Sequence, residues 1–101
     1  MNITVLGAGM VGRAIVKDLA ADANIHVTAV DQNRKNLDKL TAGASIAVQQ
    51  ADVLNEEHLK PLLSNSRLVI NALPGSIGFQ VLQQIISLGR DVVDISFFEQ
   101  D

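Results

Sequence analysis

Three glycines near the start of the chain have the spacing of a phosphate-binding turn. The stretch is Gly7-Ala8-Gly9-Met10-Val11-Gly12, in the pattern Gly-x-Gly-x-x-Gly. In such a turn the first glycine permits a tight bend, the second lets a phosphate approach the backbone, and the third lets the next helix pack closely on the preceding strand. Free N–H groups at the helix start then donate to the phosphate, aided by the helix dipole. No Gly-Lys-Ser/Thr follows, which separates this turn from a P-loop.

An acidic residue, Asp31, stands 19 residues after Gly12 and ends the next run of strand-forming residues. A carboxylate in this position accepts hydrogen bonds from the adenosine ribose hydroxyls and repels a 2′-phosphate, so the sequence favours NAD over NADP. Arg34 and Lys35 follow closely, and a cation there can bind a 2′-phosphate, which leaves NADP as the less favoured cofactor. We therefore predict Asp31, Gln32 and Arg34 as cofactor-binding residues. The alternative for Asp31 is that it only caps a helix.

Two further stretches are predicted to complete a dinucleotide site. Asp52 and Val53 follow the third strand, where the adenine edge would rest, although Asp52 is an equally good helix cap. Asn71, Ala72, Leu73 and Pro74 end the fourth strand, close to the expected pyrophosphate and nicotinamide ribose. A Pro-Gly pair is also an ordinary turn, and a glycine loop alone has purely structural uses. The glycine loop together with the acid after the second strand is what favours dinucleotide binding.

Other kinds of site find little support in the sequence. His26 and His58 are the only histidines, and neither has a catalytic partner nearby, so both are predicted to lie on the surface. The chain has no cysteine, which excludes disulfides, thiolate metal sites and a cysteine nucleophile. We predict no catalytic residue and no metal site within this chain.

Composition limits the fold and the class of partner. A length of 101 residues allows one domain, and a hydrophobic content of 48% provides ample core material. The formal charge is −3 and the eight Lys and Arg residues are scattered, so nucleic acid is not expected as a partner. No apolar run approaches the roughly 20 residues of a membrane span, and there is no leader-like start. We expect a soluble, cytoplasmic protein.

Hydrophobic periodicity predicts an alternating α/β chain. The expected strands are 2–6, 26–30, 45–48, 67–72 and 92–95, and the expected helices are 10–22, 32–40, 55–64 and 77–88. Asn24, Gly43 and Gly89 are expected to end the first, second and fourth helices. Because each βαβ crossover returns the chain in the same direction, the sheet is parallel. We predict a Rossmann-type, doubly wound sheet of five strands in the order 3-2-1-4-5, with helices on both faces and the ligand crevice between the first and fourth strands.

The motifs together resemble those of a known family. They comprise the glycine loop with the preceding Thr4-Val5-Leu6, the acids Asp31 and Asp52, the stretch 68–75 ending in Asn-Ala-Leu-Pro-Gly, and the stretch 92–97 containing Val-Asp-Ile-Ser. The chain is similar over its whole length to the N-terminal nucleotide-binding domain of the saccharopine dehydrogenase family, which includes saccharopine reductases and lysine 6-dehydrogenases. The two strand-end stretches are the more particular part of this resemblance.

The resemblance implies an NAD(P)-linked oxidation or reduction at an amino-acid C–N bond. In that family a following domain supplies the amino-acid pocket, much of the catalytic surface and the dimer contacts. The resemblance therefore implies that residues 1–101 form the cofactor half, inactive when isolated. We predict that the end of the chain carrying Phe97 and Phe98 either self-associates or is poorly ordered. One alternative is a regulatory NAD(H)-sensing domain of the type that gates potassium channels and transporters. Another is a Rossmann-like interaction domain that binds no ligand, which measurable NAD binding would exclude.

Overall fold

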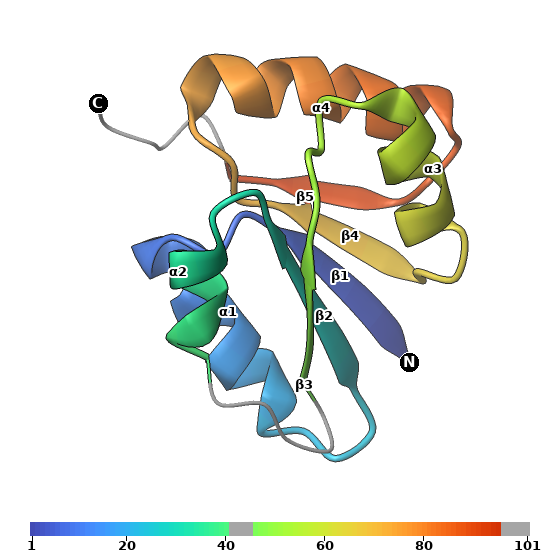
Figure 1. Ribbon diagram of the computed structural model, residues 1–101. Coiled ribbons are helices and arrows are strands. Elements are labelled where there is room, and N and C mark those ends of the chain that lie inside the picture. The colour runs from blue at the N-terminus through green and yellow to red at the C-terminus, as the bar shows by residue number, and fades with distance from the viewer. Residues whose placement is uncertain (41–45, 96–101) are drawn as a thin grey trace.

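Five parallel strands form the centre of the molecule (Figure 1). The computed structural model describes residues 1–40 and 46–95. The strands are β1 (Asn2–Leu6), β2 (His26–Asp31), β3 (Ile46–Gln50), β4 (Leu68–Asn71) and β5 (Val92–Asp94). Their order in the sheet is β3-β2-β1-β4-β5, and every neighbouring pair is parallel. The predicted doubly wound sheet and its strand order are confirmed.

Four helices cover the two faces of this sheet. They are α1 (Met10–Ala20), α2 (Arg34–Asp38), α3 (Glu56–Leu63) and α4 (Gly75–Ser87). The helices α1 and α2 lie on one face, and α3 and α4 lie on the other (Figure 1). Since α1 leaves β1 toward one face while α4 leaves β4 toward the other, the loops after these two strands diverge. This divergence creates the crevice expected at a topological switch point.

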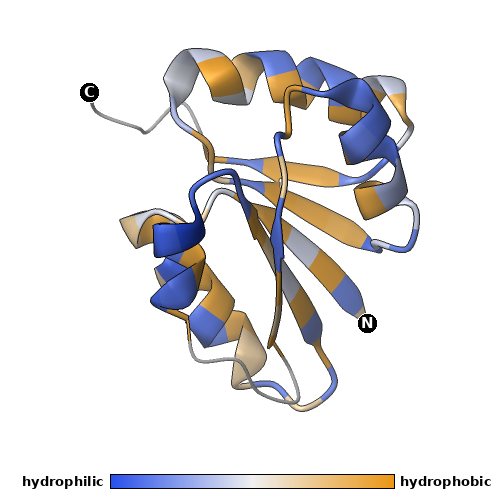
Figure 2. Cartoon of the chain, viewed as in Figure 1, coloured by the Kyte–Doolittle hydropathy of each residue, from blue (hydrophilic) through white to orange (hydrophobic). Residues whose placement is uncertain are grey.

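Each face of the sheet has its own hydrophobic core. Successive side chains of a strand point to opposite faces, so Ile3 and Val5 pack toward α1 and α2 while Leu6 packs toward α3 and α4. Figure 2 shows the result, with hydrophobic residues concentrated in the strands and hydrophilic ones on much of α2. The central strands β1 and β4 are buried on both sides, as a parallel sheet requires.

Helix ends differ from the sequence prediction where local hydrogen bonds decide them. Helix α1 ends at Ala20, and the following turn is closed by Asp22, whose Oδ1 accepts from the Asn24 N–H at 2.9 Å. No described residue other than glycine has a positive φ, so the predicted left-handed Asn24 is wrong. Gly89, at φ +74°, does follow the end of α4 as predicted. Gly43 and Ser45 lie outside the described residues.

Asn55 begins α3, and its replacement should weaken the fold measurably. The Asn55 side chain accepts from the Glu57 N–H at 3.0 Å, which satisfies one unpaired donor of the first turn. Changing Asn55 to Ala should lower the free energy of unfolding by about 1 kcal/mol, read from thermal or denaturant unfolding. Asn55→Asp keeps a capping oxygen and serves as the control. Equal stability of the two variants would contradict the capping role.

Helix length also bears on membrane association. Within residues 1–40 and 46–95, none of the helices combines the length and the hydropathy that a transmembrane segment requires.

Candidate dinucleotide crevice

A cavity of about 830 Å³ lies at the carboxyl ends of the parallel strands. Its volume falls within the range of roughly 300 to 1,000 Å³ that small-molecule and cofactor sites occupy. It is lined by Gly7, Gly9, Met10, Val11, Gly12, Asp31, Gln32, Asn33, Asn36, Asp52, Val53, Leu54, Ala72, Leu73, Pro74 and Ile77. The loops that follow β1, β2, β3 and β4 thus meet around one cavity, where the sequence predicted the ligand crevice.

The three loop glycines are required for different reasons. Gly7 has φ +96°, and a Cβ there would lie 2.8 Å from the Ala72 carbonyl oxygen. A Cβ on Gly12 would lie 1.9 Å from the Gly7 carbonyl oxygen, so the helix can approach the strand only through a glycine. Gly9 has an extended backbone that any residue can adopt, and its missing Cβ would meet nothing within 4 Å. Packing explains Gly7 and Gly12 but not Gly9.

Helix α1 points an uncapped N-terminus into the cavity. Its N-cap is Gly9, which has no side chain to accept from the first-turn N–H groups, and that turn contains no acidic residue. The first N–H groups of a helix need acceptors, and the helix dipole makes them attractive to an anion. The helices α2 and α3 are capped by the side chains of Asn33 and Asn55, whereas α4, with Pro74 as its N-cap, has no side-chain cap either. An anionic ligand would supply the acceptors that α1 lacks.

The Asp31 carboxylate joins the glycine loop to the start of α2. One oxygen accepts from the Ala8 N–H at 2.7 Å and from the Asn36 amide at 3.2 Å, and the other accepts from the Asn33 N–H at 2.7 Å. The cap of α2 is Asn33, so the alternative role of Asp31 as the helix cap is wrong. Asp31 lines the cavity and also holds the loop against β2.

The loop after β3 forms one end of the cavity. Asp52 accepts from the Leu54 N–H at 3.1 Å in a local turn, and the cap of α3 is Asn55, so Asp52 does not cap that helix. Val53 is almost completely buried in the core beneath α3, while Leu54 is 41% exposed and reaches the cavity. An acidic side chain and two aliphatic ones are therefore available for an adenine ring.

Three predicted site residues do not line the cavity. Ala8 is buried, and its carbonyl accepts from the Arg13 guanidinium at 2.9 Å. Arg34 is exposed and pairs with Asp38 on the surface of α2. Asn71 is completely buried behind the loop that follows β4, so direct contact between its side chain and a ligand in this cavity is not available.

The cavity also contains residues that the sequence prediction missed. They are Asn33, Asn36, Leu54 and Ile77. Asn33 and Asn36 lie at the start of α2, and Ile77 lies in the first turn of α4. Leu54 directly follows Val53. The signal that could have found them is position: the first turn of each helix after a strand faces the same crevice.

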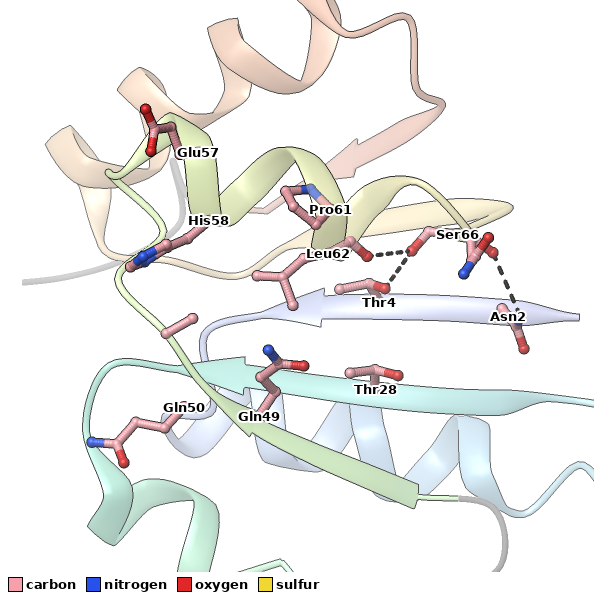
Figure 3. A pocket seen from close by; sticks show the side chains of 12 residues that line it. Asn2, Thr4, Thr28, Gln49, Gln50, Glu57, His58, Pro61, Leu62 and Ser66 are labelled. Carbon is pink, nitrogen blue, oxygen red and sulfur yellow. Dashed lines mark hydrogen bonds between the residues drawn. The ribbon is translucent and has the colours of Figure 1, made fainter.

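A second, more polar groove of about 640 Å³ lies beside α3 (Figure 3). Side chains from β1, β2 and β3, among them Thr4, Thr28 and Gln49, point into it. Thr4 is buried and hydrogen-bonded to Ser66, whereas Gln49 is exposed. His58 lies at this groove and, like His26, is exposed as predicted. In the described part of the chain no three His, Asp or Glu side chains gather as metal ligands would.

Sequence comparison identifies relatives of the chain. A family model described as "Saccharopine dehydrogenase NADP binding domain" matches residues 3–101. The chain is 27% identical over 96 residues to saccharopine dehydrogenase (NADP(+), L-glutamate-forming) of Saccharomyces cerevisiae, covering 95% of this chain and 22% of the relative. It is also 31% identical over 72 residues to a probable 3-hydroxyacyl-CoA dehydrogenase of Caenorhabditis elegans, covering 71% of this chain and 22% of that protein. The chain thus spans about a fifth of the length of these curated relatives.

Structure comparison gives the same picture. The apo saccharopine dehydrogenase (L-Glu forming) of Saccharomyces cerevisiae superposes with a TM-score of 0.80 at 27% identity, over 92% of this chain and 21% of the yeast chain. A Rossmann-fold NAD(P)-binding family protein of Shigella flexneri superposes with a TM-score of 0.75 at 21% identity, over 90% of this chain and 49% of the other. The second match shows a shared fold only.

Proposed function

The chain belongs to the family of saccharopine dehydrogenase NADP-binding domains, and from this premise we propose that its crevice binds a nicotinamide dinucleotide for an oxidoreductase acting at an amino-acid C–N bond. The remaining four fifths of the length found in the relatives would supply the amino-acid pocket and the rest of the catalytic surface. Residues 1–101 alone would bind the cofactor without turning over a substrate.

The observation that carries this proposal is the glycine at position 9. Its backbone conformation is open to any residue and nothing packs against it, yet a glycine stands there, at the uncapped start of α1. Close approach of a ligand to the backbone accounts for a glycine in such a place. A pyrophosphate is the ligand that fits, because it brings oxygen acceptors and negative charge to the free N–H groups.

We place the dinucleotide across the cavity from β3 to β4. The adenosine half would lie at Asp31, Asp52 and Leu54, and the pyrophosphate at Gly9 and the first turn of α1. The nicotinamide half would then lie at Ala72–Pro74, the wall that follows β4. The bound nicotinamide supplies hydride transfer. The residues of this chain would hold the two phosphates, orient the ring and, through Leu73 and Ile77, keep water from its inner face.

The sequence prediction of NAD over NADP is not supported by the relatives. The matching family is described as NADP-binding and the yeast relative is named for NADP(+). We propose that this crevice also prefers the phosphorylated form. The Asp31 carboxylate already accepts three hydrogen bonds from the chain, which spreads its negative charge over those donors and leaves less of it to repel a phosphate. Arg34, with 55% of its side chain exposed, can leave its surface pair with Asp38 at little cost.

Calorimetric titration with NADPH, NADH and their oxidised forms tests this proposal. We expect binding of both reduced cofactors and tighter binding of NADPH. Failure of every dinucleotide to bind would refute the proposed function. Tighter binding of NADH would support the proposed function but refute the preference for NADPH, in favour of the NAD preference that the sequence predicted.

A charge-removing variant tests the role of Arg34. Arg34→Gln should weaken NADPH binding about tenfold, because one charge-assisted contact to the 2′-phosphate is lost. NADH affinity should stay unchanged. Lys17→Gln, which removes the same charge from an exposed position on α1, is the matched control and should affect neither cofactor. Equal losses in both variants would mean that general electrostatic attraction, and not Arg34, recognises the phosphate.

A further inference from the structure

Asn71 is a buried polar residue at the end of β4, directly before the crevice wall of residues 72–74. Its side chain has no exposed surface, and its amide donates to the Gly78 carbonyl in the first turns of α4 at 2.8 Å. The side-chain oxygen accepts a longer hydrogen bond, 3.4 Å, from the Leu73 N–H. A buried amide without partners would cost free energy, so these bonds fix the side chain in one orientation. In that orientation the amide faces α4, and the side chain does not line the cavity.

The wall that follows Asn71, residues 72–74, packs directly against the glycine loop. The Ala72 N–H donates to the Leu6 carbonyl at 2.8 Å and extends the pairing of β1 with β4 by one residue. The peptide between Ala72 and Leu73 lies very close to Gly7, since a Cβ added to Gly7 would be 2.8 Å from the Ala72 carbonyl oxygen. The strand ladder therefore holds the wall on its β1 side.

Asn71 holds the same wall on its α4 side. The Gly78 N–H donates to the Pro74 carbonyl at 2.7 Å, which closes the first turn of α4, and the Gly78 carbonyl accepts from Asn71. The chain thus runs from the strand through the wall into the helix and is tied back to the strand by one amide. Leu73, Pro74 and Ile77, which line the cavity, all lie within this tied segment.

We propose that Asn71 is a positioning residue that sets the nicotinamide half of the crevice by clamping residues 72–78 onto β4. The proposal rests on the proposed function, since it assumes a dinucleotide with its nicotinamide end at this wall. It replaces the predicted direct contact of Asn71 with the cofactor. A clamp of this kind predicts that loss of the amide affects one half of the ligand and spares the other.

Two variants and two ligands separate this role from a general structural one. Asn71→Asp keeps the size and the acceptor but loses the donor to Gly78, and Asn71→Ala loses both. In each, we expect NADPH affinity to fall about tenfold, while affinity for adenosine 2′,5′-bisphosphate, which has only the adenosine half, changes less than twofold. Equal losses for both ligands, or no loss for either, would overturn the proposal.

Thr4→Val is the matched control. It removes another buried hydrogen bond, between Thr4 and Ser66, at a place that does not line the crevice. We expect a lower unfolding midpoint with both affinities unchanged. If Thr4→Val reproduces the selective loss of NADPH affinity, the effect belongs to general destabilisation and the clamp is refuted.

Nuclear magnetic resonance of the unaltered protein keeps the proposal testable if the Asn71 variants do not fold. The side-chain amide signals of Asn71 should shift when NADPH is added and stay in place with adenosine 2′,5′-bisphosphate. If calorimetry shows that the protein binds NADPH but the Asn71 signals do not shift, the clamp is refuted and the proposed function is not. Absence of any dinucleotide binding would instead refute the proposed function, and the clamp with it.

Discussion

Replacing Gly12 by alanine should destabilise the domain by about 3 kcal/mol or more, because the added methyl group has no space. Its Cβ would lie 1.9 Å from the Gly7 carbonyl oxygen and 2.9 Å from the Gly7 carbonyl carbon. Both atoms belong to the backbone, so relief requires α1 to move away from β1. That movement would open the core packed around Val16 and Val5, which are completely buried.

Thermal unfolding measures this effect. For a domain of this size, 3 kcal/mol corresponds to a fall in midpoint of roughly 12 to 24 °C. Gly75→Ala is the control, because a Cβ there meets nothing within 4 Å and alanine is the better helix former. We expect it to unfold at the same temperature or a higher one. A Gly12→Ala protein that unfolds within a few degrees of the parent would contradict the close packing of loop and helix.

The fold was predictable because periodicity and turn residues agree with each other along the chain. Strands such as 2–6 and 67–72 are apolar and bounded by turn formers, and the helices between them have clear apolar faces. Alternation of the two then fixes a parallel sheet and its strand order. The ends of elements were less predictable, since competing local bonds decide them. At Asp22, for example, a carboxylate closes the turn that the sequence had assigned to Asn24.

The residues that line the cavity were predictable where a backbone motif fixes their position, and less so where the hydrogen-bond partners of side chains decide it. Gly7, Gly9 and Gly12 have positions set by the motif, and they line the cavity. The burial of Asn71 could not be predicted, because its partner, the Gly78 carbonyl, is seven residues away in a helix whose packing angle no local pattern gives. Asp31 lines the cavity, and its hydrogen bonds to Ala8 and Asn36 depend on how the loop and α2 come together.

The resemblance to saccharopine dehydrogenases is confirmed by a family match over residues 3–101, and it is the basis for proposing chemistry at an amino-acid C–N bond. Gly9 and the uncapped start of α1 are the basis for proposing where the pyrophosphate lies. The prediction of self-association rests on Phe97 and Phe98, which lie outside the described residues.

Replacing Gly9 should have the opposite pattern to replacing Gly12: loss of binding in a protein that remains stable. Gly9 has φ −68° and ψ −169°, which alanine adopts without strain, and its Cβ would meet no protein atom within 4 Å. The space it would enter is the cavity itself, at the N-terminus of α1. A methyl group there keeps a phosphate from the first N–H groups. We expect NADPH affinity to fall about tenfold or more in Gly9→Ala, equivalent to about 1.4 kcal/mol or more.

A larger side chain at position 9 should deepen the loss of binding without unfolding the protein. Loss of affinity in a protein that stays folded is the result that distinguishes a ligand-contacting glycine from a structural one. Gly9→Val should weaken NADPH binding further, to about a hundredfold, while the unfolding midpoint falls by no more than the roughly 4 to 8 °C that loss of a good N-cap residue costs. Calorimetry and thermal unfolding of the same samples measure both quantities. Ala14→Ser, an added atom at an exposed position of the same helix, should change neither. Undiminished NADPH affinity in Gly9→Val would mean that the pyrophosphate does not approach this turn.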